Sequence, residues 1–184
     1  MVTASGSPAP IERTRAVEVF GNRYGRLYDD EVISPDGGTG RYLRWQWEHD
    51  GVVIVPHQSD KFALVPMYRY PIGSVSLEFP RGARKPGESV ASAALRELRE
   101  EAGFAGINLR ILGRVHPDTG LIESAINVVS AEVPSTFPDR AEPEAMESIA
   151  EPRWLSRAEI SVEVTRGQIT CGVTLSALAL ALCQ

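Results

Sequence analysis

The sequence predicts a mixed α/β fold in which a small antiparallel β-sheet precedes a larger domain of strands and helices. Short runs of β-prone residues are separated by turn clusters, and residues 89–102 carry the clearest amphipathic helix. Helical patterns return near the C-terminus. Strands interspersed with helices are typical of a mixed α/β domain.

The first domain is expected at residues 1–50, with a disordered lead over residues 1–12 and a β-sheet after it. The segments of this sheet are residues 17–20, the stretch near Leu27, the turn cluster 34–38 and the alternating run 41–48.

The second domain is expected at residues 51–184. Its predicted strands lie at residues 51–55, 62–65, 75–79, 107–115, 125–133 and 152–155. Its predicted helices lie at residues 89–102, 157–166 and 173–182, and the last is strongly apolar.

Composition narrows the class of protein. The chain has 184 residues, 43% of them hydrophobic, and 19 basic against 24 acidic residues give a net charge of -5. An acidic chain is unlike a nucleic-acid-binding domain, and no apolar run reaches the roughly 18 residues of a membrane span. The start lacks the pattern of a signal peptide, and Cys171 and Cys183 form no disulfide or metal-ligand pattern. We therefore expect a cytoplasmic enzyme with no nucleic-acid or membrane partner.

The helix at residues 89–102 carries the residues of most chemical interest. Ser89 is suited to cap its start and Gly103 to close its end. Glu97, Glu100 and Glu101 follow at i, i+3 and i+4, which groups the three acids on one face. That face is explained either by solvent and the neighbouring arginines or by a hard divalent cation, for which carboxylates are natural ligands.

The loop before this helix favours the cation. A turn rich in glycine and proline around Gly82 can bring backbone carbonyls close to a metal held by the helix. A diphosphate substrate needs such cations, because they offset its charge and stabilise the charge that develops in the transition state.

The segment resembles the Nudix box with every defined position filled. The matching residues are Gly82, Glu88, Arg96, Glu97, Leu98, Glu100, Glu101, Gly103 and Phe104. The resemblance implies an α/β/α sandwich with a mixed sheet, divalent-metal catalysis, and attack of water on a diphosphate phosphorus.

The resemblance also implies the metal ligands. Glu97 and Glu101 would be the principal ones, Glu100 would share a further ion, and the backbone carbonyl of Arg81 would add an oxygen. The expected ion is Mg²⁺, with Mn²⁺ as a substitute.

Other box residues would have structural roles. Arg96 would hold a glutamate by ion pairing and Glu88 would brace Arg96, while Gly82 and Gly103 shape the loop and the helix end.

Flanking segments are similar to the ADP-ribose pyrophosphatase branch of this family. The similar segments are residues 61–65, 68–71, 78–82 and the closing stretch 154–178. Arg69 would bind a phosphate through its planar fork, although an ordinary strand-end arginine explains it as well. Trp45 and Trp47 point the same way from one strand, so they would stack on a base or form a core or dimer contact.

Two departures from the branch bear on the substrate. Residues 117–120 read Pro-Asp-Thr-Gly where the branch often has Ser-Pro-Gly, and Arg81 replaces a small residue. Glu123, just beyond the first of these, would help bind metal or ribose or is a plain surface acid.

The general base is expected from the loop at residues 138–152. Its acids are Glu142, Glu144, Glu147 and Glu151. We favour Glu147 and then Glu144, because the residues that follow resemble the strand after the branch's catalytic glutamate. The role requires a carboxylate within reach of the attacking water.

The resulting hypothesis is Mg²⁺-dependent hydrolysis of ADP-ribose, or a related nucleoside diphosphate sugar, to a nucleoside monophosphate and a sugar phosphate. The alternatives are another sugar nucleotide such as GDP-mannose, a dinucleotide, or a module that binds ADP-ribose without cutting it. By analogy with the branch, the first sheet would join two subunits in a homodimer.

Overall fold

The structure is a computed structural model that describes residues 6–134, 141–142 and 146–183. Two compact units divide the chain. The first unit holds residues 1–49 and 118–124, and the second holds residues 50–117 and 125–184.

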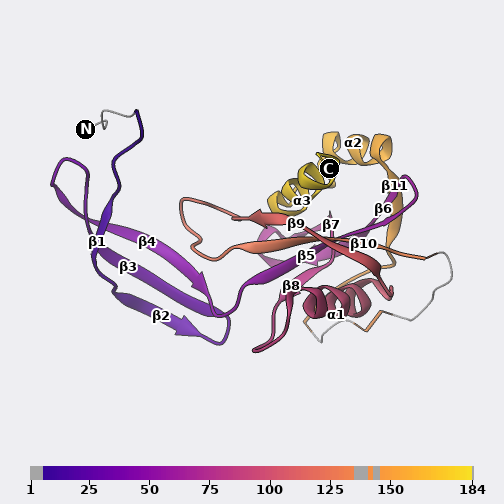
Figure 1. The fold of residues 1–184 in the computed structure, drawn as a ribbon, viewed down its shortest axis with the longest axis horizontal. Coiled ribbons are helices and arrows are strands. Elements are labelled where there is room, and N and C mark those ends of the chain that lie inside the picture. The colour runs from indigo at the N-terminus through magenta and orange to yellow at the C-terminus, as the bar shows by residue number, and fades with distance from the viewer. Residues whose placement is uncertain (1–5, 135–140, 143–145, 184) are drawn as a thin grey trace. The chain divides into compact units, whose positions relative to one another are not determined.

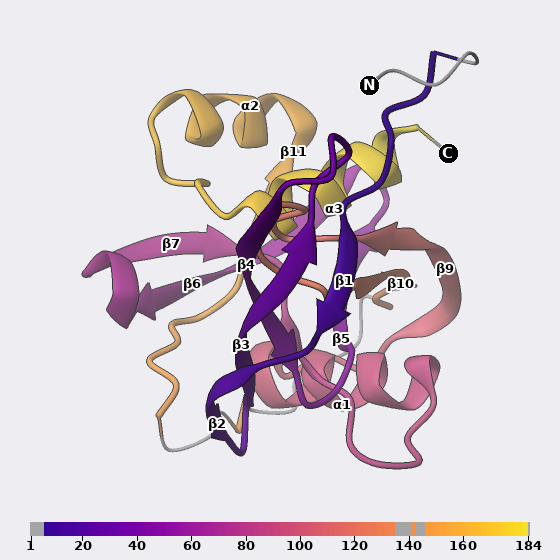
Figure 2. The same cartoon turned by 90° about the vertical axis from the view of Figure 1, so that its left-hand side faces the viewer.

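The first unit is built on an antiparallel sheet of four strands. These are β1 (Glu12–Arg15), β2 (Glu18–Asn22), β3 (Gly25–Ile33) and β4 (Thr39–Trp47). The long strand β3 pairs with β4 along its whole length, and β1 and β2 share its other edge (Figure 2). The side chain of Asn22 accepts hydrogen bonds from the backbone of Tyr24 and Gly25, which fixes the turn between β2 and β3.

The segment at residues 118–124 extends this sheet. The Trp45 N–H donates to the Leu121 carbonyl at 2.8 Å, and the Glu123 N–H donates back to the Trp45 carbonyl at 2.9 Å. The Trp47 N–H donates to the Ser124 hydroxyl at 2.9 Å. A loop distant in sequence is therefore an integral part of the first unit.

The second unit contains a mixed sheet of seven strands. They are β5 (Gly51–Gln58), β6 (Lys61–Arg69), β7 (Ser74–Glu78), β8 (Arg81–Ala83), β9 (Ile107–Val115), β10 (Ile126–Glu132) and β11 (Arg153–Ser156). The main order is β11-β6-β5-β10-β9, in which β10 runs parallel to β5 and the other pairs are antiparallel.

This sheet forks between β5 and β6. The two strands pair only next to their connecting turn, at His57–Phe62 and Gln58–Lys61. Farther along, β6 pairs with β7 and β5 pairs with β8. Phe79 and Pro80 cross from one branch to the other, and the Ile54 N–H donates to the Pro80 carbonyl at 2.8 Å.

Helices cover both faces of the second sheet. Helix α1 (Val90–Ala102) lies on one face, and α3 (Gly172–Leu182) lies on the other beside α2 (Arg157–Thr165) (Figure 1). A short 3₁₀ helix, η1 (Tyr70–Ile72), joins β6 to β7. The predicted α/β/α sandwich with a mixed sheet, preceded by a small antiparallel sheet, is confirmed.

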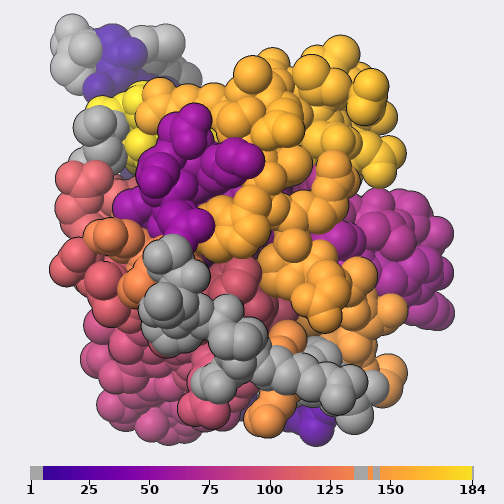
Figure 3. Space-filling model, turned by 90° about the vertical axis from the view of Figure 1, so that its right-hand side faces the viewer, coloured from indigo at the N-terminus to yellow at the C-terminus, as the bar shows by residue number. Residues whose placement is uncertain are grey.

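The edge of the second unit at β11 is open to view in Figure 3. The turn between β5 and β6 lies beside β11 and α2 there, in agreement with the pairing of Ser156 with Lys61. No helix of the described residues has the length and apolar character needed to cross a bilayer.

The main core lies between α1 and the sheet. Its buried members are Val52, Ile54, Val65, Met67, Ala93, Ala94, Leu98, Ala102, Val129, Ala131 and Val133. Helix α1 begins where predicted, because the Ser89 side chain accepts a hydrogen bond from the Ser92 N–H at 3.0 Å. It ends at Gly103, which has a φ of 68° that favours glycine.

Candidate active site

Helix α1 presents its glutamates from a largely buried face. Glu97 is 7% exposed and Glu101 is 2% exposed, on the side of the helix that also buries Ala94 and Leu98. Glu100 is partly exposed. The helical spacing predicted from the sequence therefore places two carboxylates where water is scarce.

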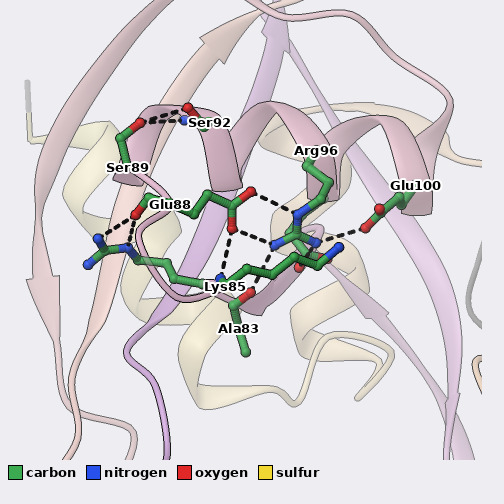
Figure 4. Close-up of polar contacts among 9 residues, drawn as sticks. Ala83, Lys85, Glu88, Ser89, Ser92, Arg96 and Glu100 are labelled. Atoms are coloured by element: carbon green, nitrogen blue, oxygen red, sulfur yellow. Dashed lines mark hydrogen bonds and ion pairs between the residues drawn. The ribbon is translucent and has the colours of Figure 1, made fainter.

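Arg96 connects the helix to the preceding loop (Figure 4). Its Nε and Nη2 donate to the two carboxylate oxygens of Glu88 at 2.9 and 3.0 Å. Its Nη1 donates to Glu97 at 2.6 Å and to Glu100 at 2.9 Å, and its Nη2 also reaches the Ala83 carbonyl at 2.9 Å. These contacts engage the guanidinium group, which therefore holds the carboxylates of Glu88, Glu97 and Glu100 in place.

Charge pairing shifts the pKa values of this network. Hydrogen bonds from Arg96 lower the pKa of Glu88 to about 2. The same carboxylate, with Glu97 and Glu100, raises the pKa of Arg96. Both groups therefore stay charged throughout the physiological range.

Burial acts in the opposite direction on the two deeper carboxylates. Loss of solvent raises the pKa of Glu101 to about 8, although the Arg81 N–H donates to it at 2.8 Å, and Glu147 and Glu97 add repulsion. Burial also raises the pKa of Glu97, against the opposing effect of Arg96. A further positive charge at this position would stabilise both ionised forms.

Gly82 allows the closest approach between the loop and the helix. Strand β8 pairs Gly82 with Val52 and Arg81 with Val53, which brings the loop backbone up to α1. A Cβ at position 82 would overlap the carboxylate of Glu97. Only glycine fits here without displacing Glu97.

The donor set fits a hard divalent cation. Glu97 and Glu101 offer buried carboxylate oxygens, the type of ligand that such a cation prefers, and burial raises the pKa of both groups. Within the described part of the chain, no three acidic, histidine or cysteine side chains already surround one common point. Glu97 and Glu100 each direct one carboxylate oxygen to Arg96.

Arg69 and Arg81 share one buried carboxylate. Glu78 is 2% exposed and accepts from the Arg69 Nε at 3.1 Å and Nη2 at 2.7 Å. The Nε of Arg81 also donates to Glu78 at 3.1 Å. Burial opposes ionisation of Glu78, but the two arginines outweigh it and hold its pKa below the usual value.

Sequence reasoning missed Glu78 and the side chain of Arg81. The available signal was an acid at the end of an otherwise uncharged β-prone run, because a charge buried in a strand requires a partner.

The segment around Glu147 docks on β6. The Tyr68 N–H donates to the Ser148 carbonyl at 2.9 Å, and Met67 forms an isolated antiparallel bridge with Ile149. The carboxylate of Glu147 acts electrostatically on Glu97 and Glu101. Glu147 therefore lies within electrostatic range of the acidic helix face.

Of the other candidate bases, Glu142 and Glu151 belong to the described residues. Glu144 lies outside the described residues. Glu142 is described, and its N–H donates to the Glu100 carbonyl at 2.9 Å, so this part of the loop contacts the last turn of α1. Glu151 is exposed.

Trp45, Trp47 and Glu123 belong to the first unit. Both tryptophans are partly buried, and the ring of Trp45 lies so close to Gly25 that a Cβ there would collide with it. Glu123 forms an ion pair with Arg44, whose guanidinium also reaches the buried Asp30 at 2.6 Å. These contacts favour structural roles, and the predicted substrate roles of the three residues stay predictions.

Comparison with known proteins identifies the family. Residues 47–170 match the NUDIX domain. The chain is 30% identical over 134 residues to an ADP-ribose pyrophosphatase of Bacillus subtilis, across 71% of each protein. It is 34% identical over 105 residues to the ADP compounds hydrolase NudE of Escherichia coli, across 57% of this chain and 55% of that relative.

A solved structure supports the assignment. The crystal structure of an ADP compounds hydrolase is 25% identical and superposes with a TM-score of 0.79, across 95% of this chain and 94% of that one. The likeness therefore extends over both units. Because the NUDIX domain matches residues 47–170, more than half of the chain, the chain belongs to the NUDIX family.

Proposed function

We propose that the protein hydrolyses the diphosphate bond of ADP-ribose or a related nucleoside diphosphate sugar, releasing a nucleoside monophosphate and a sugar phosphate. One observation carries the proposal: two buried carboxylates, Glu97 and Glu101, lie against a glycine loop whose neighbouring arginines are partly exposed. The names of the relatives, which act on ADP compounds and ADP-ribose, support this substrate class.

Nudix hydrolases generally require a divalent metal ion, and we propose Mg²⁺, with Mn²⁺ able to replace it. Glu97, Glu101 and Glu100 would hold the ion with the backbone carbonyl of Arg81. When bound, the cation offsets the charge of the diphosphate and acidifies water. The raised pKa values of Glu97 and Glu101 are consistent with this role, because a nearby cation would favour their ionised forms.

The chain's own residues divide the remaining work. Glu147 would accept a proton from the attacking water, the new bond would form between that oxygen and phosphorus, and the bridging P–O bond would break. Arg69 would orient a phosphoryl group through its planar fork. Arg96 would keep Glu97 and Glu100 in place through the contacts described above.

A substrate panel tests the proposal. Nucleoside monophosphate release from ADP-ribose, other ADP-sugars, GDP-mannose and dinucleotides would be measured with and without Mg²⁺ through a coupled phosphatase. We expect ADP-ribose or a close ADP-sugar to give the highest kcat/KM, and turnover to require the metal. A higher kcat/KM for GDP-mannose or a dinucleotide would contradict ADP-ribose as the substrate and assign that compound instead. Binding without turnover would identify the protein as a binding module.

Glu101→Gln sharpens this test. We expect the variant to fold and to lose activity by orders of magnitude, because it removes a proposed ligand for the cation. Glu163→Gln is the matched control, since Glu163 lies on α2 and pairs with Arg153. Full Mg²⁺-dependent activity in Glu101→Gln would contradict the metal assignment.

We also propose a cytoplasmic homodimer that acts on small molecules rather than on nucleic acids or membranes. Exposed apolar side chains on the first sheet, including Phe20, Tyr42 and Leu43, support association through that unit. Light scattering coupled to size exclusion would give the mass, and a monomer at micromolar concentration would contradict the dimer.

A further inference from the structure

Arg69 and Arg81 are two arginines of the second unit that bind the same buried carboxylate, that of Glu78. Arg96 has its donors engaged by Glu88, Glu97, Glu100 and a backbone carbonyl, so it offers little to a ligand. The side chains of Arg69 and Arg81 are 29% and 28% exposed. Both are therefore accessible while being held in place.

The contacts with Glu78 determine which guanidinium atoms of Arg69 and Arg81 remain available to a ligand. Each guanidinium approaches Glu78 through its Nε and Nη2 edge, at 2.7 to 3.1 Å. Among the residues that the structure describes, neither Nη1 group makes a hydrogen bond. Each arginine therefore retains its Nη1 donors.

Charge and rigidity both favour an anionic ligand. Two guanidinium groups and one carboxylate leave one net positive charge beside the acidic face of α1. Because both arginines bind the same buried oxygen of Glu78, their side-chain torsions are fixed before a ligand arrives. A donor pair ordered in advance loses less conformational entropy on binding.

We propose that Arg69 and Arg81 form a two-armed clamp for the phosphoryl groups of a diphosphate, in which the Arg81 side chain is a binding residue and Glu78 positions both arginines. The inference rests on the proposed function for the identity of the substrate. It gives a role to the side chains of Glu78 and Arg81, which the motif leaves without one. The clamp predicts direct binding of a diphosphate group even where no bond is cut.

Direct binding therefore tests the clamp separately from catalysis. The probe is methylenediphosphonate, a diphosphate analogue that resists hydrolysis, titrated calorimetrically in MgCl₂ into the full chain. Loss of one charged hydrogen-bonding group predicts that Arg81→Gln weakens binding about tenfold or more. Arg81→Lys should recover part of the affinity, because it restores the charge without the planar fork.

Arg110→Gln is the matched control, because it removes the same charge from an exposed position on β9. Wild-type affinity in Arg81→Gln would overturn the clamp. Equal weakening by Arg110→Gln would also overturn it, since the effect would then be one of net charge.

Glu78→Gln separates positioning from simple electrostatics. Removing a negative charge beside an anion site should tighten binding if net charge alone matters. The clamp predicts weaker binding, because an amide supplies only one acceptor oxygen and releases the guanidinium groups. Tighter binding would overturn the positioning role of Glu78. If this variant fails to fold by circular dichroism, the Arg81 variants decide the proposal.

The outcomes also separate the clamp from the proposed function. If the wild type hydrolyses none of the substrate panel but Arg81→Gln weakens methylenediphosphonate binding, the clamp stands and the function fails. If the wild type cuts ADP-ribose and Arg81→Gln binds the probe unchanged, the function stands and the clamp fails.

Discussion

Replacing the buried Glu101 with glutamine should change how the stability of the metal-free protein depends on pH. Burial raises the pKa of Glu101 from 4.5 to about 8, and the side chain is 2% exposed, so solvent screens it little. Between these values the native state keeps a proton that the unfolded state has lost. The stability of the wild type must therefore fall as pH rises through this range.

The magnitude follows from the width of the range. Each pH unit between the two pKa values lowers the free energy of unfolding of the wild type by about 1.4 kcal/mol. The total loss is therefore about 5 kcal/mol once the pH exceeds 8. Glutamine cannot ionise, and its oxygen can still accept the Arg81 N–H. The free energy of unfolding of Glu101→Gln, minus that of the wild type, should thus increase by about 4 kcal/mol from pH 5 to pH 8.

Urea denaturation in EDTA at pH 5, 6, 7 and 8 measures this difference directly. Parallel pH profiles for the two proteins would refute the reasoning, because Glu101 would then titrate as it does in the unfolded chain. Repeating the series in Mg²⁺ should raise the stability of the wild type most at pH 8, where a cation replaces the retained proton, and should raise that of Glu101→Gln much less.

Three further substitutions probe other parts of the site. Gly82→Ala should displace the carboxylate of Glu97 and lower kcat/KM about 100-fold, measured with ADP-ribose at saturating Mg²⁺; unchanged kinetics would show that the loop can shift at no cost. Glu147→Gln should lower kcat about 100-fold or more without changing Mg²⁺ affinity, and the same loss in Glu144→Gln instead would move the base to that residue. Trp45→Ala should raise KM about tenfold if the ring stacks on a base; an unchanged KM with lower thermal stability would assign the ring to packing.

Much of the fold could be predicted from local patterns. The helix at Val90–Ala102 has both an amphipathic repeat and recognisable caps, and the strand at Ile107–Val115 was predicted with its observed bounds. Two short strands were not predicted. β1 (Glu12–Arg15) is entirely polar and exposed, and β8 (Arg81–Ala83) spans only three residues around a glycine. Both depend on pairing with distant strands, which periodicity cannot reveal.

The residues of the candidate site likewise divide into those that a local pattern predicts and those that depend on contacts between distant segments. The glutamates of α1 follow from a motif within one continuous segment, because helical spacing alone sets their common face. Glu78 depends on three segments, since Arg69 and Arg81 reach it from β6 and β8. The pairing of Glu123 with Arg44 likewise joins positions far apart in the chain. Contacts of this kind require the tertiary structure.

The fork between β5 and β6 restricts where this protein can change in length. Only Phe79 and Pro80 lie between Glu78 and Arg81. Glu78 belongs to the pairing of β7 with β6, and Arg81 belongs to the pairing of β8 with β5. One inserted or deleted residue would slide a ladder by one position and turn its side chains to the opposite face. Arg81 would then point away from Glu78, so homologous chains should keep this four-residue bridge constant.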